Sequence, residues 1–223
     1  MEYLFIFLIL ICLYIIFIIF KSFGKNEFQM FGYNLEKYAL GWLFKLYYPF
    51  KCENEKVVPL DGPIILCSNH IHFMDQFLAI LKVKRSIHYM AKKEYFDNRK
   101  TRWFFQNVGC IPVDRSIHDN NAKSLALEVL NKNLALGLFP EGTRNRTKEL
   151  LQPFKFGAVS LAKKTNAVIV PVAITGEYKF RTKNLKIKFG KPFKVGNMSL
   201  EEANTKLYNI ILKMIKDEEK CAK

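Results

Sequence analysis

Residues 64–82 read IILCSNHIHFMDQFLAILK, and this stretch decides the fold. Its apolar run, from Ile64 to Cys67, is typical of a buried strand. The apolar residues between Asp75 and Lys82 recur at helical spacing, which predicts a helix over those residues. A strand that leads directly into a helix is the repeating element of α/β proteins. The stretch therefore indicates an α/β fold with a polar loop at the end of its first strand.

That loop contains a histidine and an aspartate that could act together. Four residues separate His70 from Asp75, and on a continuous helix this spacing would place them about 140° apart. They can therefore meet only if the strand ends at His70 and the helix begins near Phe73. Asp75 would then lie in the first helical turn and accept a hydrogen bond from one imidazole nitrogen, leaving the other as a general base. The alternative is a histidine satisfied within the loop, beside an aspartate that caps the helix.

The rest of the chain alternates strand and helix patterns. Short apolar runs predict strands over 108–113, 134–139 and 168–174, and an alternating run predicts a more exposed strand over 185–189. Helical patterns follow at 121–132, 154–164 and 199–216. Ser199 and Glu202 form a capping box at the start of the last helix. The expected fold is α/β, with a mixed, largely parallel sheet flanked by helices.

Three later segments carry polar residues at predicted strand ends: GCIPVDR at 109–115, FPEGTRNR at 139–146 and VPVAITG at 170–176. Ligands of open α/β sheets bind outside the carboxyl ends of the strands, so these segments should converge. Arg115, Arg144 and Arg146 are candidates for a phosphate clamp, because a guanidinium group matches phosphate oxygens bidentately. Each arginine could instead be a surface charge or an ion-pair partner of Asp114 or Glu141.

The N-terminus predicts a membrane anchor over residues 1–22. No charged side chain occurs from Tyr3 to Phe20, and an 18-residue helix spans about 27 Å, close to the hydrocarbon thickness of a bilayer. Lys21 and Lys25 follow the apolar run, so we expect the catalytic body on the cytoplasmic side. Glu2 stands where a cleavable signal peptide would carry basic residues, which argues against cleavage.

Residues 23–52 are expected to form an aromatic amphipathic helix and linker. The apolar residues between 33 and 50 cover a broad helical face, which suits either a core-packing helix or one at a membrane interface. The abundance of Trp and Tyr favours the interface. Residues 53–223 are long enough for one α/β domain.

The formal net charge of +15, from 35 Lys plus Arg against 20 Asp plus Glu, indicates an anionic partner. The basic residues are dispersed without a nucleic-acid-binding motif, so membrane lipids are the expected partner and nucleic acid is not. The five cysteines include no CxxC pair, and the four histidines have no partners at zinc-site spacing. Neither a disulfide framework nor a metal site is expected.

The motifs NHxxxxD, GxIPVDR, FPEGTR and VPVAI, in this order between residues 69 and 174, resemble the four blocks of a known family. It is the 1-acylglycerol-3-phosphate O-acyltransferase family of PlsC-like lysophospholipid acyltransferases. The resemblance implies that His70 is the general base and Asp75 its partner. It further implies that Pro171 shapes the acyl-donor region and that six residues bind the acceptor, namely Asn69, Arg115, Glu141, Gly142, Thr143 and Arg144.

The resemblance also implies the reaction. An acyl group would pass from acyl-CoA or acyl carrier protein to the sn-2 hydroxyl of 1-acylglycerol-3-phosphate, giving phosphatidic acid without a cofactor. We look for the oxyanion donor among the backbone amides at the start of the Asp75 helix. His72 and Asn145 stand where the family often has serine, and His72 adds a second imidazole to the assignment.

Three alternatives remain open at this point. The acceptor could be another lysophospholipid or glycerol-3-phosphate, or the chain could be a non-catalytic membrane lipid-binding protein. A hydrolase is disfavoured, because the sequence contains no GxSxG motif and no Ser or Cys in a nucleophile context.

Overall fold

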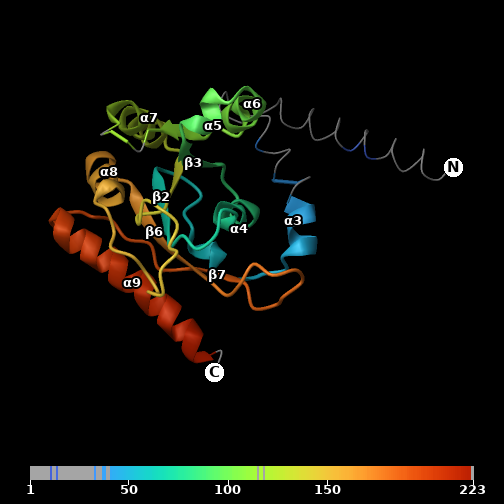
Figure 1. The fold of residues 1–223 in the computed structure, drawn as a ribbon. Coiled ribbons are helices and arrows are strands. Elements are labelled where there is room, and N and C mark those ends of the chain that lie inside the picture. The colour runs from blue at the N-terminus through green and yellow to red at the C-terminus, as the bar shows by residue number, and fades with distance from the viewer. Residues whose placement is uncertain are drawn as a thin grey trace.

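The computed structural model describes residues 41–114, 116–117 and 119–221, together with Ile11, Tyr14, Tyr33, Lys37 and Tyr38. Within these residues the strands form one seven-stranded sheet in the order β1-β7-β6-β2-β5-β3-β4 (Figure 1). The strands are β1 Lys51–Glu53, β2 Ile64–Ser68, β3 Ile87–Lys92, β4 Ile111–Val113, β5 Ala135–Leu138, β6 Val168–Thr175 and β7 Lys186–Phe189. The helices are α3 Gly41–Tyr47, η2 Glu55–Val57, α4 Asp75–Lys82, α5 Glu94–Asp97, α6 Arg99–Asn107, α7 Asn120–Asn131, α8 Gly157–Thr165 and α9 Leu200–Cys221.

The sheet is mixed and largely parallel, which confirms the predicted fold class. The central strand β2 runs parallel to β5 on one side and to β6 on the other. Only the β6–β7 pair is antiparallel among the described strands. Cys67 lies opposite Leu138 of β5 and Pro171 of β6, so the carboxyl ends of the three strands meet at one edge.

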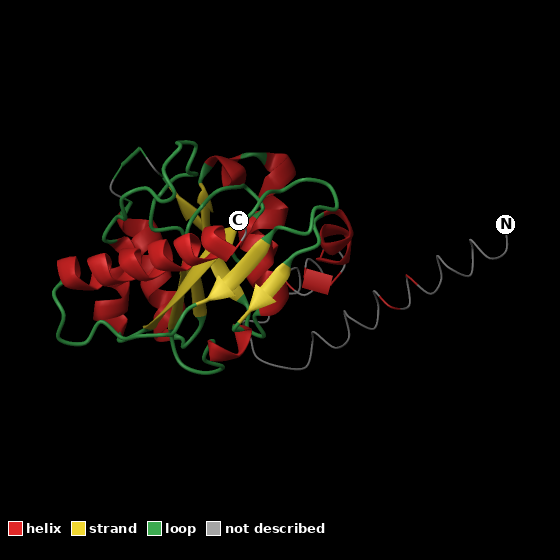
Figure 2. Cartoon of the chain, turned by 90° about the horizontal axis from the view of Figure 1, so that it is seen from below, coloured by secondary structure: helices red, strands yellow, loops and turns green. Residues whose placement is uncertain are grey.

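Helices cover both faces of the sheet. Alternate residues of β2 point to opposite faces, so Ile65 packs in a core with α7, α8 and α9, whereas Ile64 packs in a second core with α4 and α3. Figure 1 shows α8 and α9 on one side of the strands and α4 and α3 on the other, and Figure 2 shows the strands enclosed between helices. All five residues of β2 are buried, which explains its continuous apolar run.

The predicted helix within residues 33–50 appears as α3, which is amphipathic. Phe44 is buried and stacks on Phe77 of α4, with ring centroids 5.7 Å apart. Strand β1 begins at Lys51, two residues before the expected start of the α/β domain. The other side of α3 faces solvent, and its exposed apolar residues are Trp42, Leu43, Leu46 and Tyr47.

The predicted membrane anchor over residues 1–22 lies outside the described residues, apart from Ile11 and Tyr14, and stays a prediction. Within the described residues, no helix combines the length and the apolar character that crossing a membrane requires.

Two parts of the sequence fold differently from expectation. The strand predicted over 108–113 is confined to β4, so the prediction is wrong for residues 108–110. The Val108 and Cys110 amides instead donate to carbonyls of α6 and end that helix. Strand β3 and helices α5 and α6 were not predicted, since residues 84–107 mix basic and aromatic residues without a clear period.

The C-terminal helix α9 is fixed at both ends. The predicted capping box is present: the Ser199 amide donates to the Glu202 carboxylate at 2.7 Å and the Glu202 amide donates to the Ser199 hydroxyl at 3.1 Å. Near the other end, Glu218 pairs with Lys186 and Lys188 of β7. These contacts hold α9 along the sheet.

Gly137 of β5 lies under a buried ring, which generates a stability prediction. A Cβ at this position would lie 2.4 Å from Tyr89 Cε1. Gly137→Ala should therefore lower the free energy of unfolding by roughly 1–3 kcal/mol through overpacking. Thermal unfolding of detergent-solubilised protein, followed by circular dichroism, measures the loss.

The matched control is Gly157→Ala at the start of α8, where an added Cβ meets nothing within 4 Å. This variant should keep or slightly raise the melting temperature. Equal melting temperatures for the two variants would contradict the packing described for β5.

Candidate active site

His70 and Asp75 meet in the loop between β2 and α4. His70 Nδ1 lies 2.8 Å from Asp75 Oδ2. The strand ends at Ser68 and the helix begins at Asp75, so the six intervening residues turn the imidazole back over the first helical turn. Asp75 occupies Nδ1, which leaves Nε2 as the ring nitrogen that can act as a base.

The Asp75 carboxylate accepts four hydrogen bonds. Besides His70, the backbone amides of Ile71 and His72 donate to Oδ2 at 2.7 and 2.8 Å. The Tyr178 hydroxyl donates to Oδ1 at 2.7 Å. Asp75 is 1% exposed, so its carboxylate cannot form hydrogen bonds with water. The four donors supply the hydrogen bonds that burial removes. Asp75 thus orients His70 and also organises the loop, whereas the helix has no side-chain cap, so the alternative of an aspartate that only caps the helix is wrong.

The second imidazole of the motif has a different environment. His72 stacks on the Tyr178 ring, with centroids 4.2 Å apart, and its Nδ1 accepts the Met74 amide at 3.3 Å. Burial lowers the pKa of His72, which keeps its ring neutral near pH 7. His70 is therefore the imidazole paired with Asp75.

The loop after β5 holds His70 from the other side. The His70 amide donates to Glu141 Oε1 at 2.7 Å, and the His70 carbonyl accepts the Asn145 amide at 2.7 Å. The His70 ring also stacks on Phe139, with centroids 3.9 Å apart and planes inclined by 15°. The backbone and the ring of His70 are thus both held in place by the FPEGTRN segment.

Glu141 is a buried link between loops. It is 4% exposed, and its second oxygen accepts the Gln152 amide at 2.9 Å. Burial raises the pKa of Glu141, opposed by the amides of Gln152 and His70. The predicted contact of Glu141 with substrate stays a prediction, because both carboxylate oxygens are engaged with backbone amides.

Asn69 directly follows β2, and Pro171 lies in β6. The Asn69 side chain bonds both the amide and the carbonyl of Ile174 at 2.8 Å, which fastens the end of β2 to β6. Pro171 lies in β6, where the Gly190 amide donates to its carbonyl. Neither residue lines the cavity beside His70. Their substrate contacts, expected from the family pattern, also stay predictions.

A cavity of about 510 Å³ opens beside His70. Its volume is within the range of ligand sites. The apolar part of its wall comes from β3, β4, β5, α8, α9 and the loop after β4 and includes Met90, Val113, Ile117, Leu138, Leu161 and Leu200. Lys123 and Lys155 also line it, and so do Asp114 and Asp119. The cavity can therefore hold a molecule that has both an apolar chain and a charged group.

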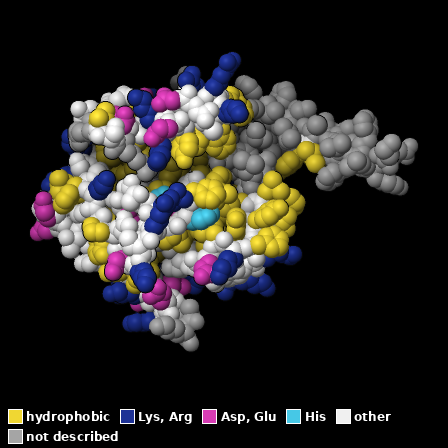
Figure 3. Space-filling model, in the orientation of Figure 1, with side chains coloured by type: hydrophobic (Ala, Val, Ile, Leu, Met, Phe, Trp, Pro, Cys, Tyr) yellow, Lys and Arg dark blue, Asp and Glu magenta, His cyan; other side chains and the backbone are white. Residues whose placement is uncertain are grey.

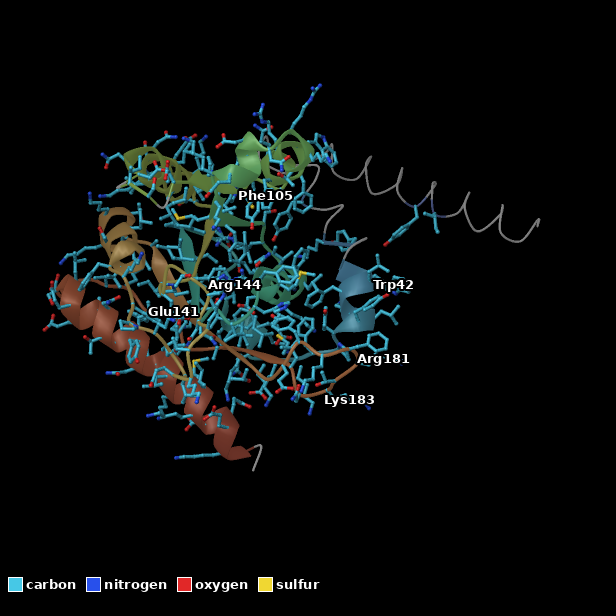
Figure 4. All side chains as sticks on the ribbon, in the orientation of Figure 1. Trp42, Phe105, Glu141, Arg144, Arg181 and Lys183 are labelled. Atoms are coloured by element: carbon cyan, nitrogen blue, oxygen red, sulfur yellow. The ribbon has the colours of Figure 1, made fainter. Side chains whose placement is uncertain are left out.

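The predicted arginines are distributed around this region. Arg144 is half-buried and acts electrostatically on His72, and Figure 4 shows it near the centre of the face viewed. Figure 3 shows histidine and cationic surface together there. Arg115 lies outside the described residues, but Asp114 and Ile117 on either side of it line the cavity. Arg146 is exposed.

The turn after β5 brings Gly142 and Thr143 to the same region. The Gly142 amide donates to the Phe139 carbonyl at 2.9 Å, and Gly142 adopts a φ of 74°. A Cβ at Gly142 would lie 2.8 Å from Lys155 Cε, so glycine leaves room for this lysine along the cavity wall. Thr143 is exposed and does not line the cavity.

Two residues of the site were not singled out from the sequence. Tyr178 lies in the loop after β6, 103 residues from Asp75, and no local spacing connects them. Lys155 lies between β5 and α8, outside the four motifs, and its position beside the cavity depends on the Gly142 turn. Backbone amides near the start of α4 were the expected oxyanion donors. Four of them already donate to partners within the loop and are not available for this role: those of Ile71, His72, Met74 and Asp75.

The Tyr178 hydroxyl generates a prediction for the site. Burial and the nearby Asp75 carboxylate raise the pKa of Tyr178, so the phenol stays protonated and donates. A hydrogen bond to a charged group contributes about 1.5–3 kcal/mol. Tyr178→Phe should therefore lower kcat by roughly 10-fold or more. The acidic limb of the pH profile of kcat/KM should move to higher pH, because the less satisfied carboxylate holds the imidazolium more strongly.

Tyr48→Phe is the control, because Tyr48 contacts the Tyr178 ring, with centroids 5.6 Å apart, and loses the same hydroxyl. It should leave the pH profile in place. An unshifted profile in Tyr178→Phe would show that the Tyr178–Asp75 bond does not influence the base.

Comparisons with known proteins agree with this geometry. A family model described as Acyltransferase matches residues 49–175. A Bacillus subtilis (strain 168) protein named 1-acyl-sn-glycerol-3-phosphate acyltransferase is 31% identical over 147 residues, which cover 64% of this chain and 72% of the relative. A Cocos nucifera protein of the same name is 32% identical over 152 residues, 63% of this chain and 49% of the relative. The match thus spans about half of the plant protein.

A solved structure has the same fold. The crystal structure of the 1-acyl-sn-glycerophosphate (LPA) acyltransferase PlsC from Thermotoga maritima superposes with a TM-score of 0.74 at 22% identity, covering 93% of this chain and 89% of that one. The family match spans more than half of the chain and contains His70, Asp75 and the loops that hold them. This chain belongs to the acyltransferase family.

Proposed function

We propose that this chain transfers a fatty acyl group from an acyl thioester to the sn-2 hydroxyl of 1-acylglycerol-3-phosphate, giving phosphatidic acid. The single observation that carries the proposal is the His70–Asp75 pair beside a cavity that has an apolar wall and charged side chains at its border. The names of the relatives from Bacillus subtilis and Cocos nucifera support the choice of acceptor. Acyl-CoA and acyl carrier protein are both candidate donors.

The proposed mechanism uses His70 as a general base. Its Nε2 takes the proton of the acceptor hydroxyl while the hydroxyl oxygen attacks the thioester carbonyl. Asp75 stabilises the imidazolium that forms. When the tetrahedral intermediate collapses, the carbon–sulfur bond breaks and the thiolate receives the proton from His70. The products are an ester and a free thiol, and no acyl group is attached to the protein.

The two ends of the lipid suit different walls of the cavity. The apolar residues of β3, β5 and α8 offer a place for an acyl chain. Lys155 lines the cavity, and we propose that Arg144 and Arg115 act with it to bind the phosphate. The amino end of α8 also borders the cavity and has no side-chain cap, so its helix dipole adds to the positive potential.

We also propose that the protein works at a membrane, with its catalytic body on the cytoplasmic side. The uncharged N-terminal segment supports an anchor, and the exposed apolar side of α3 supports contact with the bilayer interface. Both the acceptor and the product reside in the bilayer, so an enzyme held there meets its substrate directly.

The base assignment is tested by His70→Ala. The variant should lose thiol release by a factor on the order of 10²–10⁴, because a general base contributes that much to the rate. The assay measures acceptor-dependent release of thiol from acyl-CoA or acyl carrier protein, with purified protein in detergent and a panel of acceptors that includes 1-acylglycerol-3-phosphate, other lysophospholipids and glycerol-3-phosphate.

His72→Ala is the matched control, because it removes the neighbouring imidazole that does not pair with Asp75. It should retain most of the activity. If His70→Ala kept as much as a tenth of the wild-type rate, or if His72→Ala were equally inactive, His70 would not be the base. Thiol release without an acceptor would identify a hydrolase instead.

Arg115→Ala tests the phosphate contact. A contact made equally in the ground state and the transition state raises the KM for the acceptor and leaves kcat largely unchanged. We expect this result for 1-acylglycerol-3-phosphate, whereas the KM for the thioester should stay constant. Arg99→Ala, at an exposed position of α6, is the control and should leave both KM values unchanged. An effect of Arg115→Ala on the donor alone would contradict the assignment.

A further inference from the structure

The loop between β6 and β7 ends in an exposed tip with a distinct composition. Phe180 is 66% exposed, although it is a large apolar side chain. Three cations in the same loop are also exposed: Lys179, which pairs with the exposed Glu177, and Arg181 and Lys183. Exposing a phenylalanine side chain to water costs free energy. The same side chain flanked by cations is stabilised at a membrane, where an apolar layer lies beneath an anionic surface.

Contacts with α3 hold the tip in place. The Arg181 amide donates to the Tyr47 carbonyl at 2.8 Å, and the Phe180 and Tyr47 rings lie 5.4 Å apart. Arg181 adopts a φ of 55°, in the left-handed region that is unfavourable for residues other than glycine. Strain of this kind persists only where surrounding contacts enforce it. The exposure of Phe180 is therefore a property of an ordered loop.

The tip continues the exposed side of α3. We call the combined surface the aromatic edge, and its residues are Trp42, Leu43, Leu46, Tyr47, Phe180, Arg181 and Lys183. Figure 4 shows Trp42, Arg181 and Lys183 along one edge of the molecule, and Figure 3 shows hydrophobic surface adjoining cationic side chains on that side. Exposed apolar residues gathered in one place mark an interaction site.

We propose that the tip of the β6–β7 loop is a membrane-docking element that inserts Phe180 into an anionic bilayer while Arg181 and Lys183 bind lipid headgroups. Charge complementarity selects this occupant, because Arg181 and Lys183 follow the apolar side chain in the loop and the whole chain carries a formal charge of +15. Long Arg and Lys stems can lie along the apolar layer with their charged ends at the headgroups.

Docking of this loop would also position the catalytic pair relative to the membrane, a consequence that rests on the proposed function. Tyr178, two residues before Phe180, donates to Asp75. His72 lies between Tyr178 and Phe73, with ring centroids 4.2 and 4.4 Å from them, and Phe73 is 56% exposed. The same loop thus contacts the lipid at its tip and the catalytic carboxylate at its base.

Lipid contact is measured directly with a tryptophan at the tip. Phe180→Trp is made in the full chain with Trp42→Phe and Trp103→Phe, so that one tryptophan remains. The protein is reconstituted into phosphatidylglycerol or phosphatidylcholine vesicles that contain brominated acyl chains. Emission from residue 180 should be quenched by the brominated chains, and more strongly in phosphatidylglycerol. The test variant and the control described next both use the full chain with the same N-terminal segment, so they differ only in the position of the tryptophan.

Asn209→Trp in the same background is the control, because Asn209 is exposed on α9, which packs on the opposite face of the sheet. It should be quenched less than residue 180. Equal quenching at the two positions would overturn the proposal. So would quenching at residue 180 that does not depend on lipid charge, or a tip that is instead buried between two copies of the chain.

Activity separates failure of docking from failure of the proposed function. Each cation at an anionic surface contributes roughly a fivefold factor, so R181Q/K183Q should weaken docking about 30-fold. Its rate with acceptor embedded in phosphatidylglycerol vesicles should fall, whereas its rate with a water-soluble, short-chain acceptor should not change. K213Q/K216Q, with the same charge change at exposed positions of α9, should behave as wild type. Equal rates of the two double variants on vesicles would overturn docking, whereas no transfer by the wild type to either acceptor would overturn the proposed function.

Discussion

The buried carboxylate of Asp75 is the group on which the site depends. It accepts bonds from the His70 ring, the Ile71 and His72 amides and the Tyr178 hydroxyl. A carboxylate that is 1% exposed is tolerable only with such partners, so folding of the β2–α4 loop and alignment of the His70 ring depend on the same interactions. Replacing Asp75 by alanine would therefore disturb the backbone of the loop as well as the orientation of the imidazole.

Three strand ends meet around this carboxylate, and the site residues divide into two groups. One group fastens the loops to one another: Asn69 bonds β6, and Glu141 bonds the amide of His70. The other group lines the cavity and includes Gly142 and Lys155. The buried Glu141 of the FPEGTR motif contacts His70 through its backbone amide and not through its ring. Glu141 and Asn69 therefore help to hold the loop that carries His70.

Much of this could be predicted from the sequence because the information is local. Continuous apolar runs indicated β2, β5 and β6, the capping box indicated the start of α9, and the spacing of His70 and Asp75 required the strand to end before the helix began. Other features depend on contacts that are remote in sequence. Tyr178 reaches Asp75 across 103 residues, and β3 is recognisable as a strand only from its partners β5 and β4. Val108 is apolar and was predicted to lie in a strand, but its amide donates to the Phe104 carbonyl and takes part in the turn that ends α6.

The central claim is that Asp75 holds His70 with Nδ1 protonated and Nε2 available as a base. The most direct test is nuclear magnetic resonance of the ¹⁵N-histidine-labelled protein in detergent at pH 8, where an ordinary imidazole is neutral. The chain has four histidines, so replacing each by glutamine assigns the signals. The account predicts a His70 ring with a protonated Nδ1, shifted by a strong hydrogen bond, and an unprotonated Nε2. A His70 ring protonated at Nε2, or one that exchanges freely between the two tautomers, would contradict it.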